Sequence, residues 1–481
     1  MIASGARPQH ARQRNEHTGR AVFAAAICAF VGIAVPLVIH GAPLADDFNN
    51  CVAPVELGFG GFMAASWHLL GAIRPARFLE ILLTGSICRT LPFGVAIGVS
   101  LLVTLAVAWQ TRSLLRDLGV PETWADVGGA AWLLQPLGTE AGLWPAAFHV
   151  PLGLLLAVAA VRLYHRGRIG WGAVANLAAA LSVEQIILPL PLAAWLVATP
   201  VKRRRAAVVS AVIGALVIAT FFLWPGTNPR LRTTGLERLE GLVANPSFYI
   251  GFPAVGLGLH SIPVAILWAL PWSVAVLAAA AFLGWRIGPP LGDASRPIGK
   301  RNWIRGLIAF AAIVVLTNVV VVLAVPQQGS PRVFAPTWLV LAIGGAWAGA
   351  FTEWRRPRLL GLCSVVFAAG AVLSLALSAS VRLRSADFTA RATRIVAARV
   401  PERGRVAVCE VRRTVVEPAP RGAYAVHEFL YDWAAERALE YYTGRHATVY
   451  LAGDVLGQAC PAAKDVDAVI RFDQLLAAPP P

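Results

Sequence analysis

The chain has 481 residues, of which 57% are hydrophobic and only 14% are charged, whereas about 25% charged residues are typical of a soluble domain. Its mean hydropathy of +0.63 excludes an ordinary soluble enzyme. A net charge of +16 could indicate a nucleic-acid-binding protein, but the Lys and Arg residues stand in short clusters between apolar segments, as in the loops of membrane proteins. We therefore predict a polytopic membrane protein that binds membrane lipids and no nucleic acid.

The N-terminus begins with a basic tail, residues 1–20, followed by an apolar run over 21–39. This arrangement resembles a signal peptide, but the run is long enough to span a bilayer and lacks a small-residue cleavage site. We expect a retained first span with a cytoplasmic N-terminus.

Further apolar segments of roughly membrane-spanning length follow along the chain. The block 170–200 has basic clusters on both sides, at 166–168 and 202–205, so it has to cross the membrane twice, as two short or partly re-entrant helices that turn near 182–185. We expect about eleven spans in a transmembrane domain over 21–380. Besides that block, they are 21–40, 91–110, 125–137, 146–163, 206–225, 261–285, 306–325, 336–352 and 359–380.

The first loop, residues 41–90, is far longer than a simple turn and carries many Phe and Leu residues interrupted by Gly and Pro. This composition predicts short helices that lie in the membrane interface. The positive-inside rule places this loop outside the cytoplasm, together with the loops 135–145, 226–260 and 326–336 and everything after about 381.

The last hundred residues, 381–481, are richer in Arg, Asp and Glu. Helical patterns alternate there with β-like runs, which predicts a small extracytoplasmic α/β domain. The helical patterns cover 385–400 and 430–443, and the β-like runs cover 406–411, 448–451 and 468–472.

Two pairs of cysteines would lie in the oxidising compartment outside the cytoplasm. Cys51 and Cys88 belong to the first loop, and Cys409 and Cys460 to the C-terminal domain. A disulfide within each pair is compatible with that compartment, but the sequence alone does not establish either bridge.

Asp46 and Asp47 are adjacent carboxylates just beyond the first predicted span. In an extended chain neighbouring side chains point to opposite sides, so the two do not form the facing pair of a retaining glycosidase. One could act as a general base while the other orients a substrate or binds a cation. The alternative is that both merely mark the water interface. No cofactor is required, and a divalent metal at the pair stays open because two acids are too few ligands to predict one.

Two arginines on the outer face could bind a phosphate. Arg77 lies in an apolar interfacial segment, where it could otherwise snorkel to the headgroups, and Arg332 begins a span, where it could otherwise anchor the helix.

Three further residues are candidates for lining a substrate cavity. Glu184 and Gln185 lie between two apolar runs, where an acid either faces a cavity or forms a turn in water. Glu140 stands on the same outer face, near His149, which we expect to be structural.

The segments 45–48 (Ala-Asp-Asp-Phe), 76–78 (Ala-Arg-Phe) and 331–333 (Pro-Arg-Val), with the Gln185 hairpin, resemble the GT-C superfamily of polytopic glycosyltransferases. Within it, they are similar to bactoprenol-glucosyl-transferase-like membrane proteins of bacteria. The resemblance covers nearly the whole chain and implies a polyprenyl-phosphate-linked sugar donor, a glycan or lipid acceptor, and a location in the bacterial inner (plasma) membrane.

The resemblance also implies roles for individual residues. Asp47, or Asp46, would deprotonate or orient the acceptor hydroxyl during an inverting attack on the anomeric carbon. Arg77 and Arg332 would stabilise the charge of the departing lipid phosphate.

Two other classes of function compete with a transferase. A transporter or flippase would line a path with the same charged residues, although we find no matching halves in the sequence. A catalytically silent scaffold would bind a partner through the outer domain.

Overall fold

The computed structural model describes residues 9–43, 46–70, 75–135, 142–223, 310–314, 316–317, 331–350, 357–410, 432–453 and 459–476. The predicted loop 226–260 and span 261–285 lie outside the described residues, as does most of the predicted span 306–325. The protein is mostly helical, with one small parallel sheet near its C-terminus. The elements before that sheet are α1 (Gln9–His40), α2 (Asp46–Leu70), α3 (Pro75–Thr90), α4 (Gly94–Asp117), α5 (Glu122–Leu133), η1 (Pro145–Ala147), α7 (His149–His165), α8 (Ile169–Ala180), η2 (Glu184–Ile186), α9 (Pro189–Val197), α10 (Arg203–Leu223), α15 (Pro331–Ala350) and α16 (Pro357–Arg399).

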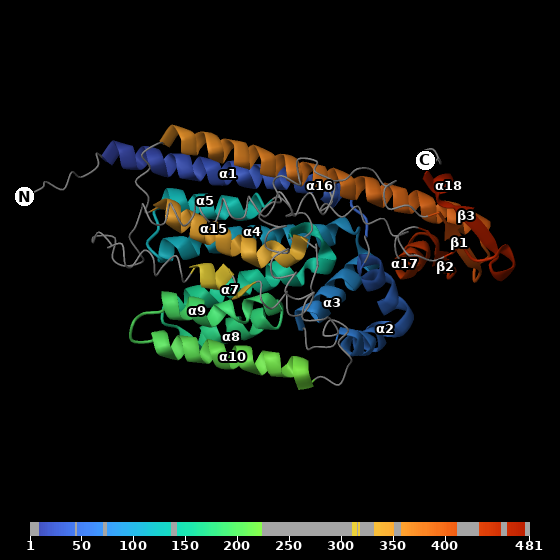
Figure 1. Cartoon of the computed structure of the whole chain (residues 1–481), viewed down its shortest axis with the longest axis horizontal. Coiled ribbons are helices and arrows are strands. Elements are labelled where there is room, and N and C mark those ends of the chain that lie inside the picture. Colours follow the sequence, from blue (N-terminus) through green and yellow to red (C-terminus); the bar gives the residue numbers. More distant parts are fainter. Residues whose placement is uncertain are drawn as a thin grey trace, which may run out of the picture.

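The helices form an elongated bundle. Figure 1 shows α1 and α16 side by side along the longest axis, with α5, α4 and α7 and then α8 to α10 beside them, and the interhelical contacts agree. Phe30, Trp132 and Leu133 are fully buried in its core. At Gly129 the helices approach so closely that a Cβ atom would lie 2.8 Å from the ring of Phe23 and 3.1 Å from the carbonyl oxygen of Ala108, so the close packing of α1, α4 and α5 requires glycine there.

Two helices are long and apolar enough to cross a membrane, judged by length and composition among the described residues. They are His17–His40 and Gly94–Asp117. The helices over 149–165 and 169–180 are apolar but shorter. The larger number of about eleven spans remains a prediction. The predicted hairpin over 170–200 is present as α8 and α9, of 12 and 9 residues, joined through η2.

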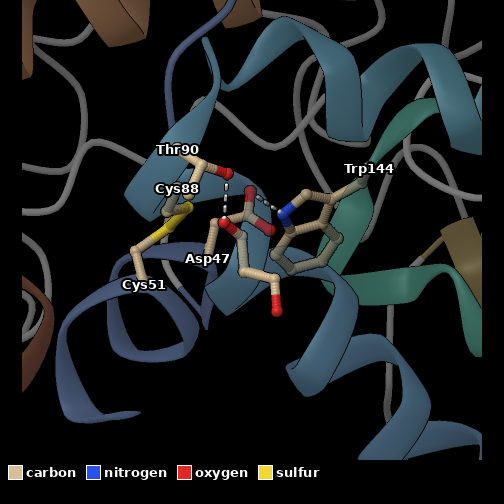
Figure 2. Close-up of a disulfide and its surroundings, with 6 residues drawn as sticks. Asp47, Cys51, Cys88, Thr90 and Trp144 are labelled. Carbon is tan, nitrogen blue, oxygen red and sulfur yellow. Dashed lines mark hydrogen bonds between the residues drawn. A yellow bond between two sulfur atoms is a disulfide. The ribbon is translucent and has the colours of Figure 1, made fainter. Parts of the chain in front are cut away.

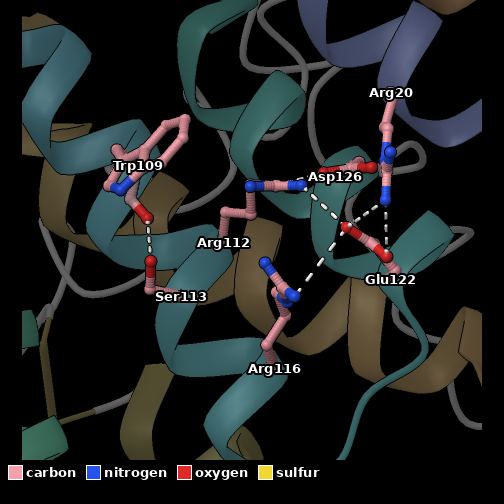
Figure 3. Close-up of polar contacts among 7 residues, drawn as sticks. All are labelled: Arg20, Trp109, Arg112, Ser113, Arg116, Glu122 and Asp126. Atoms are coloured by element: carbon pink, nitrogen blue, oxygen red, sulfur yellow. Dashed lines mark hydrogen bonds and ion pairs between the residues drawn. The ribbon is translucent and has the colours of Figure 1, made fainter.

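One end of the bundle carries a network of arginines and carboxylates, shown in Figure 3. Glu122, at the start of α5, lies 3.3 Å from Arg20 of α1, and 3.1 and 3.8 Å from Arg112 and Arg116 of α4. Arg112 also pairs with Asp126, which is fully buried. We call this end, defined by these five residues, the arginine end. Since α1 and α5 begin there and α4 ends there, successive helices of the bundle alternate in direction.

The opposite end, which we call the domain end, is where α2, α3, η1 and α17 (Asp432–Thr443) meet. The predicted first loop forms two helices there, α2 and α3, as the composition indicates. Gly58 bends α2 because its φ of +66° is readily adopted only by glycine. A disulfide joins Cys51 to Cys88 with 5.5 Å between the Cα atoms, so α2 and α3 form one cross-linked hairpin.

The C-terminal α/β domain is present as predicted. Its strands are β1 (Arg405–Cys409), β2 (Thr448–Leu451) and β3 (Ala468–Arg471), parallel in the order β2-β1-β3, with Val406 opposite Val449 on one side and Ala468 on the other. The domain also contains α17, η5 (Ala463–Asp465) and α18 (Phe472–Leu476). A second disulfide joins Cys409 to Cys460.

The domain boundary expected at residue 381 falls inside a single helix. α16 runs without interruption over 43 residues, from the bundle into the C-terminal domain, where Phe388 packs on Phe472 with 5.9 Å between ring centroids. No Gly or Pro stands between 371 and 399, so nothing in the chain breaks the helix where its composition changes from apolar to charged.

Candidate functional site

Asp47 is fully buried at the domain end of the bundle. Its Oδ2 accepts a hydrogen bond of 2.8 Å from the indole Nε1 of Trp144, as Figure 2 shows. Asp47 stands in the first turn of α2, where the helix dipole favours a negative charge. Trp144 has an extended backbone just before Pro145 opens η1. The two side chains meet because the start of α2 packs on η1.

The extended conformation expected around Asp46 and Asp47 is wrong, because both residues belong to α2. In a helix, adjacent side chains diverge by about 100°, so the two still do not face each other, as the extended chain also implied. Nothing is described of the Asp46 side chain. Of the two aspartates, Asp47 is therefore the one whose surroundings are defined.

The disulfide fixes the position of Asp47. Cys51 follows Asp47 by four residues, so the two lie on the same face of α2, and the bridge to Cys88 ties that face to the last turn of α3 (Figure 2). Near the bridge, the Thr90 hydroxyl donates a hydrogen bond of 2.9 Å to the carbonyl oxygen of Ser86. The start of α2 is thus held by the covalent cross-link at Cys51 and by the hydrogen bond from Trp144 to Asp47.

A second buried carboxylate, Glu80 of α3, lies at the same end. Its Oε2 is 2.6 Å from the Nδ1 atom of His149 and 3.4 Å from the backbone nitrogen of that residue. Glu80 is fully buried and His149 is partly exposed. Trp144 and His149 flank η1, so the short helix carries one partner of each buried carboxylate. Sequence reasoning missed Glu80, although an acid within the apolar run 78–82 is a signal of function near a membrane.

Aromatic side chains of the C-terminal domain pack against the start of α2. Phe48, fully buried beside Asp47, makes edge-to-face contacts with Tyr441 and Tyr442 of α17, with ring centroids 5.5 and 5.7 Å apart. Burial, and then the negative charge of Asp47, raise the pKa of the Tyr441 phenol above its ordinary 10.0. The charge of Asp47 therefore acts on a side chain of the C-terminal domain, which is distant from Asp47 in the sequence.

The other predicted site residues fall at the same end wherever their backbone is described. Glu184 and Gln185 form η2, and the preceding Val183 packs on Gly153, one turn after His149. Gln185 is buried.

Arg77 and Arg332 are placed by their helices only. Arg77 belongs to α3, three residues before Glu80. Arg332 is in the first turn of α15, whose Trp338 donates a hydrogen bond of 2.7 Å to the Ala131 carbonyl near the end of α5, so that turn lies toward the domain end. Nothing is described of either arginine side chain, and Glu140 lies outside the described residues.

An open groove of about 570 Å³ lies elsewhere, at the start of α8. Arg168 and Trp171 line it, and Trp171 is 69% exposed. The groove adjoins the arginine end of the bundle, where α7 ends. Beside the groove, the Gly167 carbonyl accepts a hydrogen bond from Lys202. It is not part of the candidate site.

The arrangement at the domain end is suited to proton transfer. A carboxylate oriented by an indole N–H can accept a proton from a hydroxyl, and a buried glutamate beside an imidazole can hold one. Glu56, Glu440 and His446 are the described residues whose ligand atoms lie close enough together to hold a metal ion.

No model of a known protein family matches the chain, and no curated protein sequence matches it.

Proposed function

We propose that the protein is a polytopic membrane glycosyltransferase of the GT-C type. It transfers a sugar from a polyprenyl-phosphate donor to a glycan or lipid acceptor of the cell envelope, with inversion at the anomeric carbon. The observation that carries the proposal is the buried carboxylate of Asp47, held by the indole N–H of Trp144. The fixed donor holds the carboxylate in one orientation, and a general base has to be held where it can reach the proton of the acceptor.

The distribution of charge supports the topology that this function needs. The arginine end gathers three arginines from α1 and α4, which the positive-inside rule assigns to the cytoplasm. The domain end then faces away from the cytoplasm, as donors that arrive from the outer leaflet require. Both disulfides lie toward the domain end, which fits an oxidising compartment. About eleven spans in the bacterial inner membrane, with a cytoplasmic N-terminus, complete this topology.

In the proposed reaction, Asp47 removes the proton of the acceptor hydroxyl. The oxygen attacks the anomeric carbon on the face opposite the phosphate, and the bond from that carbon to the phosphate oxygen breaks, its electron pair leaving with the lipid phosphate. General-base assistance contributes roughly 10²–10⁴-fold.

The remaining residues keep the roles that the resemblance implies. Arg77 and Arg332 would neutralise the charge of the departing phosphate, each contributing on the order of 10²–10³-fold if well placed. Asp46 would orient the acceptor. Residues of the turn at 184–185, together with Glu140, would line the cavity that receives it.

The experiment uses a deletion strain complemented with the unchanged chain, with Asp47→Asn, or with Asp387→Asn, at matched amounts in the membrane. Asp387 is an exposed aspartate of α16 and serves as the control for removing one carboxylate. Mass profiles of surface glycans and lipid-linked sugars are compared. We expect one sugar mass to be lost on deletion, restored by the unchanged chain and by Asp387→Asn, and not restored by Asp47→Asn.

Equal rescue by Asp47→Asn would remove Asp47 from the chemistry and favour Asp46, a transporter or a scaffold. If the protein is a transporter or flippase, its deletion would instead cause the unmodified lipid-linked substrate to accumulate on one side of the membrane. No sugar bond would be formed by the complementing chain. A scaffold would leave all the masses unchanged.

A further inference from the structure

Three side chains with metal-binding atoms meet where the C-terminal domain contacts the helical bundle. Glu56 belongs to α2, Glu440 to α17, and His446 to the segment between α17 and β2. Their ligand atoms all lie within 4.8 Å of one another. The Nδ1 atom of His446 is 3.6 Å from Oε1 of Glu56 and 3.6 Å from Oε1 of Glu440. Figure 1 shows α17 beside α2, so the three come from two separate parts of the fold.

Arg437 orients both carboxylates. Its Nη1 donates to Oε2 of Glu56 and, at 2.9 Å, to Oε2 of Glu440. Each glutamate therefore uses one oxygen for the guanidinium and turns the other, Oε1, toward the imidazole. Carboxylates that bind a metal usually accept such hydrogen bonds from neighbouring side chains, which fix their orientation. Two carboxylates and one guanidinium leave one unit of negative charge beside the ring.

The two separations between the histidine and the glutamates fit a metal ion better than a hydrogen bond. A separation of 3.6 Å is too long for a good hydrogen bond from an imidazole to a carboxylate. Zn²⁺ binds nitrogen and oxygen at about 2.0–2.2 Å, so neighbouring ligands of a tetrahedral site are about 3.4 Å apart. One histidine nitrogen and two carboxylate oxygens suit Zn²⁺ better than Mg²⁺ or Ca²⁺, which prefer oxygen alone.

We propose that Glu56, Glu440 and His446 bind a divalent transition-metal ion, Zn²⁺ first among them, that fastens the C-terminal domain to α2. The side chain of Glu440 is 14% exposed, that of Glu56 30% and that of His446 49%, so the site is open to solvent on the side of the histidine. Bound there, the ion holds α17 in place, and with it the two tyrosines that pack on Phe48. The site is separate from Asp47, and the proposal does not rest on the proposed function.

The test uses the full chain in detergent, purified without a polyhistidine tag and stripped with a chelator. Zn²⁺ alone is added, and bound metal is counted by elemental analysis after desalting. We expect one equivalent of Zn²⁺ in the unchanged protein and at least about tenfold weaker binding in His446→Ala and Glu440→Gln. Added Zn²⁺ should raise the Tm of the unchanged protein and not that of the two variants.

Glu410→Gln is the matched control. Glu410 is an exposed acid of the same domain that pairs with Arg471, away from the cluster, and its removal should leave Zn²⁺ binding unchanged. A second measurement needs no variant: Co²⁺ bound to the unchanged protein should give the strong visible absorption of a tetrahedral site and be displaced by Zn²⁺.

Two results would overturn the proposal. One is Zn²⁺ binding that is equal in the unchanged protein and in both cluster variants. The other is an unchanged protein that takes up no stoichiometric Zn²⁺ and gives no tetrahedral Co²⁺ spectrum, which means that Arg437 and a proton complete the cluster. If the cluster variants fail to fold, the Co²⁺ spectrum of the unchanged protein decides.

Discussion

The carboxylates at the two ends of the helical bundle have different kinds of partner. At the arginine end, Glu122 and Asp126 are bound by guanidinium groups from α1 and α4, so their charge is neutralised by permanent cations. At the domain end, Asp47 accepts from an indole and Glu80 lies against an imidazole, groups that carry no permanent positive charge. A carboxylate bound by arginine ties helices together through a permanent pair of opposite charges, whereas one held by an indole or an imidazole has no permanent countercharge.

The largest effect should come from breaking the ion pair at the arginine end. Asp126→Asn leaves Arg112 buried without its full countercharge, which costs about 3–5 kcal/mol. We expect a marked fall in the Tm of the detergent-solubilised protein, with sugar transfer per folded molecule unchanged. Glu122→Gln is the control on the same helix and should cost less, because Glu122 and its partner Arg20 are more exposed. A selective loss of transfer in Asp126→Asn would contradict the division between the two ends.

The next effect tests the cross-link at the domain end. Replacing both Cys51 and Cys88 by Ser removes a bridge between residues 37 positions apart, and native disulfides typically contribute about 2–4 kcal/mol. We expect a lower Tm in the double variant. Reduction of the unchanged protein, which also opens Cys409–Cys460, should lower the Tm at least as much. Cys28→Ser, which removes a free thiol, is the matched control and should leave the Tm unchanged. A Tm insensitive to reductant would mean that packing alone fixes the start of α2.

Trp144→Phe tests the orientation of Asp47. The change keeps an aromatic ring and removes the N–H that donates to the carboxylate, a hydrogen bond of about 1.5–3 kcal/mol. We expect roughly tenfold or more slower transfer, and the acid limb of the pH–rate profile should move to higher pH, because losing the donor favours the protonated acid. Trp132→Phe removes an N–H that donates to the Thr104 carbonyl in the bundle core and should lower stability without moving that limb.

The smallest effect is a dependence of stability on alkaline pH. The pKa of Tyr441 is raised by burial and by the charge of Asp47, so its contribution is complete below about pH 10 and is lost as the pH rises toward the folded-state value. In chelator-containing buffer, Tyr441→Phe should flatten the fall in Tm above pH 10. Asp47→Asn should move the upper limit of that fall to lower pH, since it lowers the folded-state pKa. Identical Tm profiles in all three proteins would mean that Asp47 and Tyr441 are not coupled.

Local patterns in the sequence predicted the local elements well. The helices of the first loop, the hairpin of α8 and α9, and the three strands of the C-terminal domain follow from hydrophobic periodicity and from the positions of Gly, Pro and charge. The boundary expected at 381 lies within α16, because a composition change does not end a helix that contains no residue to break it.

The sequence by itself determined the mostly helical fold with a small C-terminal α/β domain and the pair of aspartates to examine, because composition and motif spacing are local properties. Only the tertiary structure decided the surroundings of that pair. Trp144 lies 97 residues from Asp47, and His149 lies 69 residues from Glu80. Glu56 and Arg437 are 381 residues apart. Such contacts are made when separate helices pack, and periodicity within one segment carries no information about which distant segment covers it.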